Sequence, residues 1–156
     1  MTQRLDERVA GVLGVFQPSR LLVIGGGFEG ALQRAGMTGD EVTRLPAAEA
    51  AERLPRHGRF DFALVSEITE LLETQLAAEL VGALKNLHTD RFLLLADLTA
   101  SSLDRDALLA LALRPAGAMD DGRALWLYDI DGYNPERDWN NATDWAHPEN
   151  FGKYRW

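Results

Sequence analysis

The chain alternates between apolar residues at helical spacing and short runs of consecutive apolar residues. In residues 4–16 an apolar residue recurs every three or four positions, which predicts an amphipathic helix. Leu21-Leu22-Val23-Ile24 is an uninterrupted apolar run, typical of a strand covered on both faces. The same patterns predict helices over residues 4–16, 30–36, 47–54, 68–88 and 103–113 and strands over residues 21–24, 41–45, 60–65, 91–96 and 123–130. This alternation predicts an α/β fold with helices on both faces of a mostly parallel, five-stranded sheet.

The last predicted helix has signals at both of its ends. Ser102 is expected to cap the helix over residues 103–113, because its hydroxyl can accept a hydrogen bond from an unpaired amide. Pro115 and Gly117 are expected to close it. For the sheet we expect the strand order 2-1-3-4-5, with an antiparallel fifth strand as the alternative to a parallel one.

A glycine-rich loop follows the first predicted strand and precedes a helix. Its sequence, Gly25-Gly26-Gly27-Phe28-Glu29-Gly30, fits the spacing G-x-G-x-x-G at positions 25, 27 and 30. In this context the first glycine allows a tight turn, the second allows a ligand to approach the backbone, and the third allows helix and strand to pack closely. The loop therefore predicts a ligand-binding turn, with a glycine-rich turn that binds nothing as the alternative.

A dinucleotide site also needs an acidic residue about 20 positions further on, at the end of the second strand. That strand ends here in Arg44-Leu45-Pro46, and Glu49 lies inside the next predicted helix. An NAD-type site would therefore lack its ribose partner.

The loop, together with Phe60-Asp-Phe-Ala-Leu-Val-Ser-Glu67 and the helix after it, resembles the class I S-adenosylmethionine-dependent methyltransferases over residues 20–98. The resemblance implies a three-layer, Rossmann-like domain whose glycine loop holds the methionine part of S-adenosylmethionine. It also implies that the strand over residues 60–65 ends beside the sulfonium. The cofactor-binding residues expected from pattern and resemblance are Gly25, Gly26, Gly27, Phe28, Gly30, Ser66, Glu67 and Asp97. Glu67 is the strongest of them, and no catalytic base is assigned.

The chain departs from this family in three places. The family has an acidic residue two positions before the first glycine, where this chain has Val23, and another after the second strand, which is absent here. The segment between Leu45 and Phe60 holds one helix instead of the usual helix–strand–helix unit, which commonly supplies the adenine contact. We therefore expect a shortened bacterial version of the family with an altered cofactor site.

Acidic residues follow several predicted strands. Ligands of open α/β sheets bind beyond the carboxyl ends of the strands. Those ends carry Glu67, Asp97 and the pair Asp129 and Asp131. Such a rim suits a cationic group, such as a sulfonium or ammonium, or a divalent metal held by oxygen ligands. Acids that are merely solvated are the alternative. The three histidines lack metal-site spacing, so no metal ligand is assigned.

The final segment, residues 131–156, has its own composition. Its aromatic residues are Tyr133, Trp139, Trp145, Phe151, Tyr154 and Trp156. Disordered segments are poor in aromatics. We therefore expect an ordered, irregular segment whose rings pack on the body of the protein. Recognition of a partner protein by these rings is the alternative.

Composition limits the remaining choices. The 156 residues suit one domain, and no cysteine is present for a disulfide, a thiolate zinc site or an iron–sulfur cluster. The net charge of −8 argues against a nucleic-acid surface. The charged N-terminus and the lack of a long apolar stretch predict neither signal peptide nor membrane span, so we expect a cytoplasmic protein. The function expected is a methyltransferase-like domain that binds S-adenosylmethionine or a related nucleoside. The alternative is a non-catalytic scaffold for protein interaction.

Overall fold

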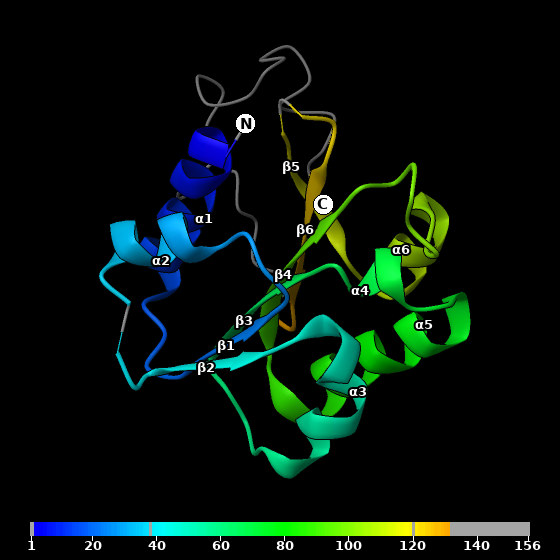
Figure 1. Ribbon diagram of the computed structural model, residues 1–156, viewed down its shortest axis with the longest axis horizontal. Helices are drawn as coiled ribbons and strands as arrows, with labels where there is room; N and C mark the ends of the chain where they lie inside the picture. Colours follow the sequence, from blue (N-terminus) through cyan, green and yellow to red (C-terminus); the bar gives the residue numbers. More distant parts are fainter. Residues whose placement is uncertain (1, 38, 120, 132–156) are drawn as a thin grey trace.

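One six-stranded sheet organises the chain (Figure 1). The structure is a computed structural model, and it describes residues 2–37, 39–119 and 121–131. The strands are β1 (Leu21–Ile24), β2 (Val42–Leu45), β3 (Phe62–Ser66), β4 (Arg91–Ala96), β5 (Arg114–Ala118) and β6 (Ala124–Asp129). Their order is β2-β1-β3-β4-β6-β5. The four strands from β2 to β4 are parallel, whereas β6 is antiparallel to both of its neighbours.

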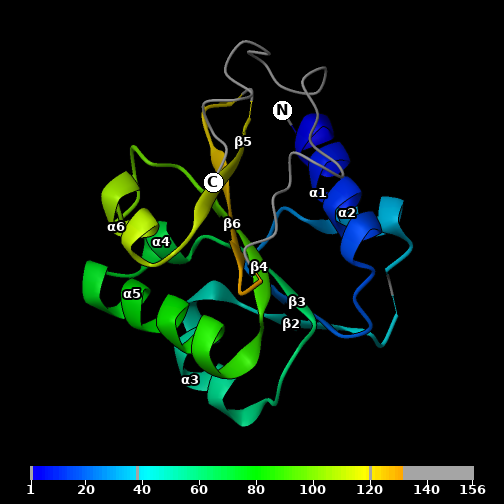
Figure 2. The ribbon, with the colours of Figure 1, turned by 180° about the vertical axis from the view of Figure 1, so that it is seen from behind.

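Helices cover both faces of this sheet, as the two opposite views show (Figures 1 and 2). On one face lie α1 (Thr2–Phe16) and α2 (Glu29–Ala35). On the other lie η1 (Ala47–Glu49), α3 (Ala50–Arg53), η2 (Leu54–Arg56), α4 (Ile68–Leu71), α5 (Thr74–Ala83), the π-helical η3 (Leu84–His88) and α6 (Arg105–Ala110). The layered α/β architecture expected from the sequence is thus present.

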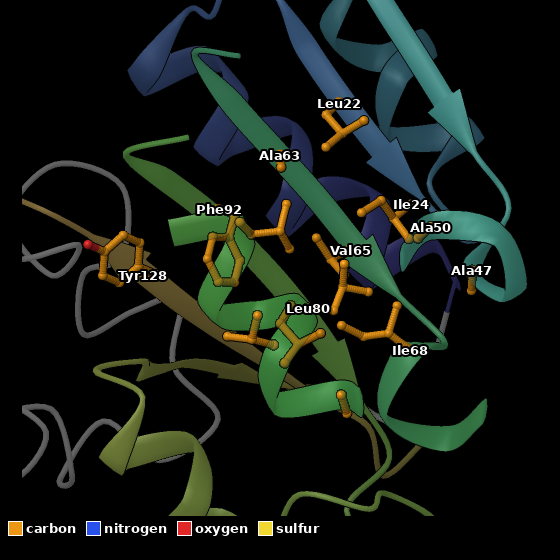
Figure 3. Packing of buried hydrophobic residues seen from close by; sticks show 14 of the residues in the cluster. Leu22, Ile24, Ala47, Ala50, Ala63, Val65, Ile68, Leu80, Phe92 and Tyr128 are labelled. Atoms are coloured by element: carbon orange, nitrogen blue, oxygen red, sulfur yellow. The ribbon is translucent and has the colours of Figure 1, made fainter. Parts of the chain in front are cut away.

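Alternate strand residues supply two separate cores. Leu22 and Ile24 pack with the layer that contains α3 and α5, and Figure 3 shows Leu22 near Ala63 and Ile24 beside Val65. Leu21 and Val23 pack on the opposite face with α1 and α2. All four residues of β1 are buried. An apolar run without alternation therefore arises because both faces of the strand are covered.

The sheet has one strand more than the sequence analysis predicted. That strand, β5, contains Pro115 and Gly117, which were expected to close a helix. Proline is tolerated in β5 because the strand lies at the edge of the sheet, and its register against β6 shifts between these two residues. The strand predicted last is β6, which lies beside β4 in the antiparallel orientation.

The longest predicted helix is interrupted. Residues 68–88 form α4, α5 and η3, because the backbone is extended at Leu72 and at Glu73 (ψ 147° and 166°). The helix predicted over residues 47–54 is likewise three short pieces, η1, α3 and η2. The cap of α6 is Asp104, whose side chain accepts a hydrogen bond from the amide of Ala107, and not Ser102.

The aromatic segment lies, from residue 132 onward, outside the described residues. Among the helices that are described, none combines the length and apolarity needed to cross a membrane.

Candidate functional site

The glycine loop and the end of β3 meet where the strand order reverses. From β1 the chain continues to β2 on one side, while β3 lies on the other side of β1. Ile24 and Val65 are partners in the sheet, so the loop after Ile24 lies beside Ser66 and Glu67. Such a reversal point, beyond the carboxyl ends of the strands, is where ligands bind in open α/β sheets.

Two hydrogen bonds join these segments. The Ser66 hydroxyl donates to the carbonyl oxygen of Gly26 over 2.7 Å, and the Gly26 amide donates to Oε2 of Glu67 over 3.2 Å. Gly25 lies between them with φ +83°, and a Cβ atom there would fall on the carbonyl oxygen of Ser66. Glycine is therefore required at position 25 both by the turn and by its neighbour.

The other predicted loop residues have different surroundings. Gly27 has φ +96° and open space where a Cβ would stand, which leaves its backbone approachable. At Gly30 a Cβ would fall on the carboxylate of Asp6, so this glycine allows α2 to approach α1. The expectation that it allows a helix to pack on a strand was wrong. The Phe28 side chain is fully buried in the core beside α1, so only its backbone can contact a ligand.

Glu67 has a strained backbone. Its φ of +71° lies in the left-handed region, which costs a residue with a side chain roughly 1–2 kcal/mol. The side chain is exposed, and it reaches back to the glycine loop. Strained residues of this kind are concentrated at ligand and active sites. Among the residues predicted from the sequence, the strained backbone supports Glu67 as a candidate ligand-binding residue.

A cleft of about 200 Å³ opens at these residues. Its lining comes from the loop after β1, the ends of β3 and β4, α4 and the β5–β6 turn: Gly26, Ser66, Glu67, Glu70, Leu95, Asp97 and Arg123. Four of the predicted residues thus share one cleft, together with Glu70, Leu95 and Arg123, which were not predicted as site residues. Glu70 could have been found, because it follows Glu67 by nearly one helical turn. Arg123 had no local signal, because only the pairing of β6 with β4 brings it there.

Two predicted acids lie elsewhere. Because β6 is antiparallel to β4, Asp129 is opposite Arg91, at the start of β4 and away from the glycine loop. The Arg91 guanidinium pairs with Asp129 at 3.2 Å and with Asp131 as well. These two acids therefore form an ion-pair cluster at the other end of the sheet, and the prediction that they rim the cleft was wrong.

Most polar groups around the cleft already have partners. Glu70 accepts hydrogen bonds from the Asp97 amide (2.7 Å) and the Thr69 hydroxyl (3.0 Å), and Asp97 accepts from Thr99. Arg123 pairs with Asp121 at 2.7 Å. The side-chain hydrogen bond from Arg123 holds the pKa of Asp121 below its usual value.

The lining has an acidic balance. Three acidic residues, Glu67, Glu70 and Asp97, line the cleft with one basic residue, Arg123. The charge of Arg123 is already balanced by its ion pair with Asp121. Such a cleft favours a cationic group over a phosphate. Within the described part of the chain, no three histidine or acidic side chains converge so that they could hold a metal ion.

Several solved structures with a similar fold are methyltransferases. An O-methyltransferase family protein from Burkholderia thailandensis matches with a TM-score of 0.57 and 12% identity, over 82% of this chain and 55% of that one. This chain thus spans about half of that protein. The methyltransferase domain of bacterial CtHen1-C matches with a TM-score of 0.55 and 13% identity, over 82% of this chain and 97% of that domain. Magnesium protoporphyrin IX methyltransferase from Synechocystis PCC 6803, with bound S-adenosylmethionine, matches with a TM-score of 0.52 and 14% identity. The match covers 81% of this chain and 77% of that protein. The chain therefore has a methyltransferase-like fold.

Comparison at the level of sequence gives less functional information. No curated protein matches the chain. One family model, described as a family of unknown function, matches residues 3–156.

Proposed function

This chain belongs to the family of unknown function DUF6231, and from that premise and its fold we propose that it binds S-adenosylmethionine in the cleft beside Gly26 and Glu67. The observation that carries the proposal is the acid-lined cleft at the reversal point of a methyltransferase-like sheet. S-adenosylmethionine has two cationic groups, an ammonium and a sulfonium. NAD and ATP instead carry phosphates, which Glu67, Glu70 and Asp97 would repel.

The dimensions of the cleft suit one part of this cofactor. Pockets for whole ligands of this size usually measure about 300–1,000 Å³, and this cleft measures about 200 Å³. It therefore fits the methionine end of the cofactor. The Glu67 carboxylate would balance the positive charge, and the open backbone at Gly27 would allow the ligand to approach.

The adenosine end would lie toward β2. There the chain passes to β3 through η1, α3 and η2 alone, in place of the longer unit of the family that the sequence resembles. On this proposal the chain is a shortened methyltransferase relative. When bound, the cofactor supplies an electrophilic methyl group, and an acceptor placed beside it would react mainly through proximity.

Ligand-dependent thermal stability tests the proposal. S-adenosylmethionine at a hundred times its dissociation constant should stabilise the protein by about 2.7 kcal/mol. S-adenosylhomocysteine, which lacks the sulfonium charge, should bind more weakly, and NAD and ATP should give no shift at matched concentration. A shift with NAD or ATP that exceeds the shift with S-adenosylmethionine would contradict the charge argument.

Replacing Glu67 with Gln isolates the contribution of its charge. Glu67→Gln keeps an acceptor for the Gly26 amide and removes the carboxylate. A charge-assisted hydrogen bond exceeds a neutral one by about 1–2 kcal/mol, so we expect roughly 5- to 30-fold weaker binding of S-adenosylmethionine by calorimetry. The control is Glu52→Gln, on exposed α3 surface, which should bind like the wild type. Equal affinity of both variants would remove Glu67 from the site.

A non-catalytic scaffold is the second candidate. It is favoured by the bond between the Gly26 amide and Glu67, which already occupies a donor that a ligand would use. On this alternative the glycine loop is structural, and none of the four ligands would change the thermal stability.

A further inference from the structure

A second hollow lies on the outer side of the helical layer that contains α3 and α5. Its volume is about 360 Å³, larger than the cleft at the glycine loop. The lining is mostly apolar and includes Leu54, Pro55, Leu76, Leu80, Leu87 and His88. Its size lies in the range of pockets that accept a large side chain or a small ligand.

Exposed leucines mark this surface. Leu76 is 45% exposed and Leu87 is 63% exposed, and both line the hollow. Leu80, by contrast, is 4% exposed and belongs to the core beneath (Figure 3). Six large apolar side chains are exposed among the described residues, and Leu76 and Leu87 are two of them. Another, Ile130, lies next to the last described residue. Clustered exposed apolar residues indicate a surface that something covers.

The end of the described chain lies close to the hollow. The Ile130 amide donates to the carbonyl oxygen of Asp90 over 2.9 Å, and Asp90 follows His88 by only two positions. Asp131, the next residue, pairs with Arg91. The chain therefore enters residues 132–156 from the end of the sheet where His88 contributes to the hollow.

The remaining segment has the length and the side chains to fill it. Residues 132–156 can span roughly 80 Å when extended, far more than the approach requires. They include Trp139, Trp145 and Trp156, and a tryptophan ring can bury about 150–250 Å² of surface. We propose that this segment folds back on its own chain and inserts a tryptophan into the hollow between α3 and α5.

His88 gives the hollow a polar group that suits an indole. Its Nδ1 lies 2.9 Å from the carbonyl oxygen of Gly58. A carbonyl oxygen only accepts, so Nδ1 carries the proton, and Nε2 is the acceptor of the neutral ring. An indole N–H is a donor of the matching kind. This inference is independent of ligand binding at the glycine loop.

The absence of cysteine allows a direct test with the full chain. Leu87→Cys introduces a single thiol, which can be labelled with a benzophenone maleimide and irradiated. We expect peptides of residues 132–156 to be cross-linked within one chain. The matched control is Leu71→Cys, because Leu71 is 59% exposed but lies outside the lining. Cross-links to the body alone, or equal tail cross-linking from both positions, would overturn the proposal. Linked pairs of chains would assign the hollow to a second copy.

Proteolysis provides a readout without a bulky label. Trypsin can cut the segment after Arg137 and Lys153. We expect Leu87→Asp to speed cleavage at these sites at least tenfold while circular dichroism remains unchanged, and Leu71→Asp to have no effect. Cleavage of the wild type as fast as of Leu87→Asp would show that nothing in the segment covers the hollow.

Discussion

At the scale of single residues, the glycine loop depends on backbone conformation and on what each glycine faces. Gly25→Ala should lower the free energy of unfolding by more than about 2 kcal/mol, because the left-handed region costs roughly 1–2 kcal/mol and the methyl group would displace Ser66. Gly27→Ala, which adds its methyl group in open space, should cost only about 1 kcal/mol. Gly82→Ala in α5 should stabilise by about 0.5–1 kcal/mol. Urea unfolding would measure all three, and equal losses at Gly25 and Gly27 would contradict the contact with Ser66.

The sequence could predict the residues of the site that follow strands. Ser66 and Glu67 come directly after an apolar run, and Gly25 and Gly26 come directly after another, so the parallel sheet brings them together. Arg123 was beyond prediction, because its place depends on how a distant hairpin pairs with β4. The opposite error at Asp129 has the same cause, since one reversed strand moves its last residue to the far end of the sheet.

At the scale of elements, the start of α6 shows how two nearby candidates for a cap differ. Asp104→Ala should cost about 1 kcal/mol, because its carboxylate accepts from the Ala107 amide over 2.8 Å. Ser102→Ala should be neutral or stabilising, because the Ser102 hydroxyl is buried without a hydrogen-bond partner. Thermal unfolding of the two variants would test the assignment. A larger loss for Ser102→Ala would restore the cap expected from the sequence.

Element boundaries were predictable only where local signals and tertiary contacts agree. The spacing of leucines over residues 68–88 is that of one helix. The break at Leu72 coincides with long-range bonds, from the Ser102 amide to the Thr69 carbonyl and from the Thr74 hydroxyl to the Ser102 carbonyl. Pro115 and Gly117 end helices in isolation, yet at a sheet edge they fit a bulged strand. In both cases partners distant in the sequence decide the outcome.

At the scale of the whole molecule, the sheet couples stability to alkaline pH through Tyr128. Burial, followed by the charges of Asp90 and Asp129, raises the pKa of Tyr128 above its usual value of 10.0. In the unfolded chain the phenol loses its proton first, so the free energy of unfolding should fall as pH rises above about 10. Tyr128→Phe should make that fall shallower. Urea unfolding from pH 8 to pH 11 would measure this, and identical slopes would contradict the assignment.

The parallel orientation of the first four strands followed from the sequence, because each apolar run is separated from the next by a helix and parallel pairing requires such connections. The order expected for these four strands was also correct. The position of the fifth predicted strand beside β4 was also correct. The additional strand β5 and the size of the cleft could not be predicted from the sequence, because both depend on how side chains and sheet edges pack in three dimensions.

The hydrogen bond between the Gly26 amide and the Glu67 carboxylate satisfies the glycine loop when no ligand is bound. A ligand must displace this bond before it can use the Gly26 amide as a donor. Association is then an exchange of one partner for another, and its free energy is a difference between two similar quantities. We therefore expect a modest affinity, with half-saturation at a higher ligand concentration than a loop with a free amide would need.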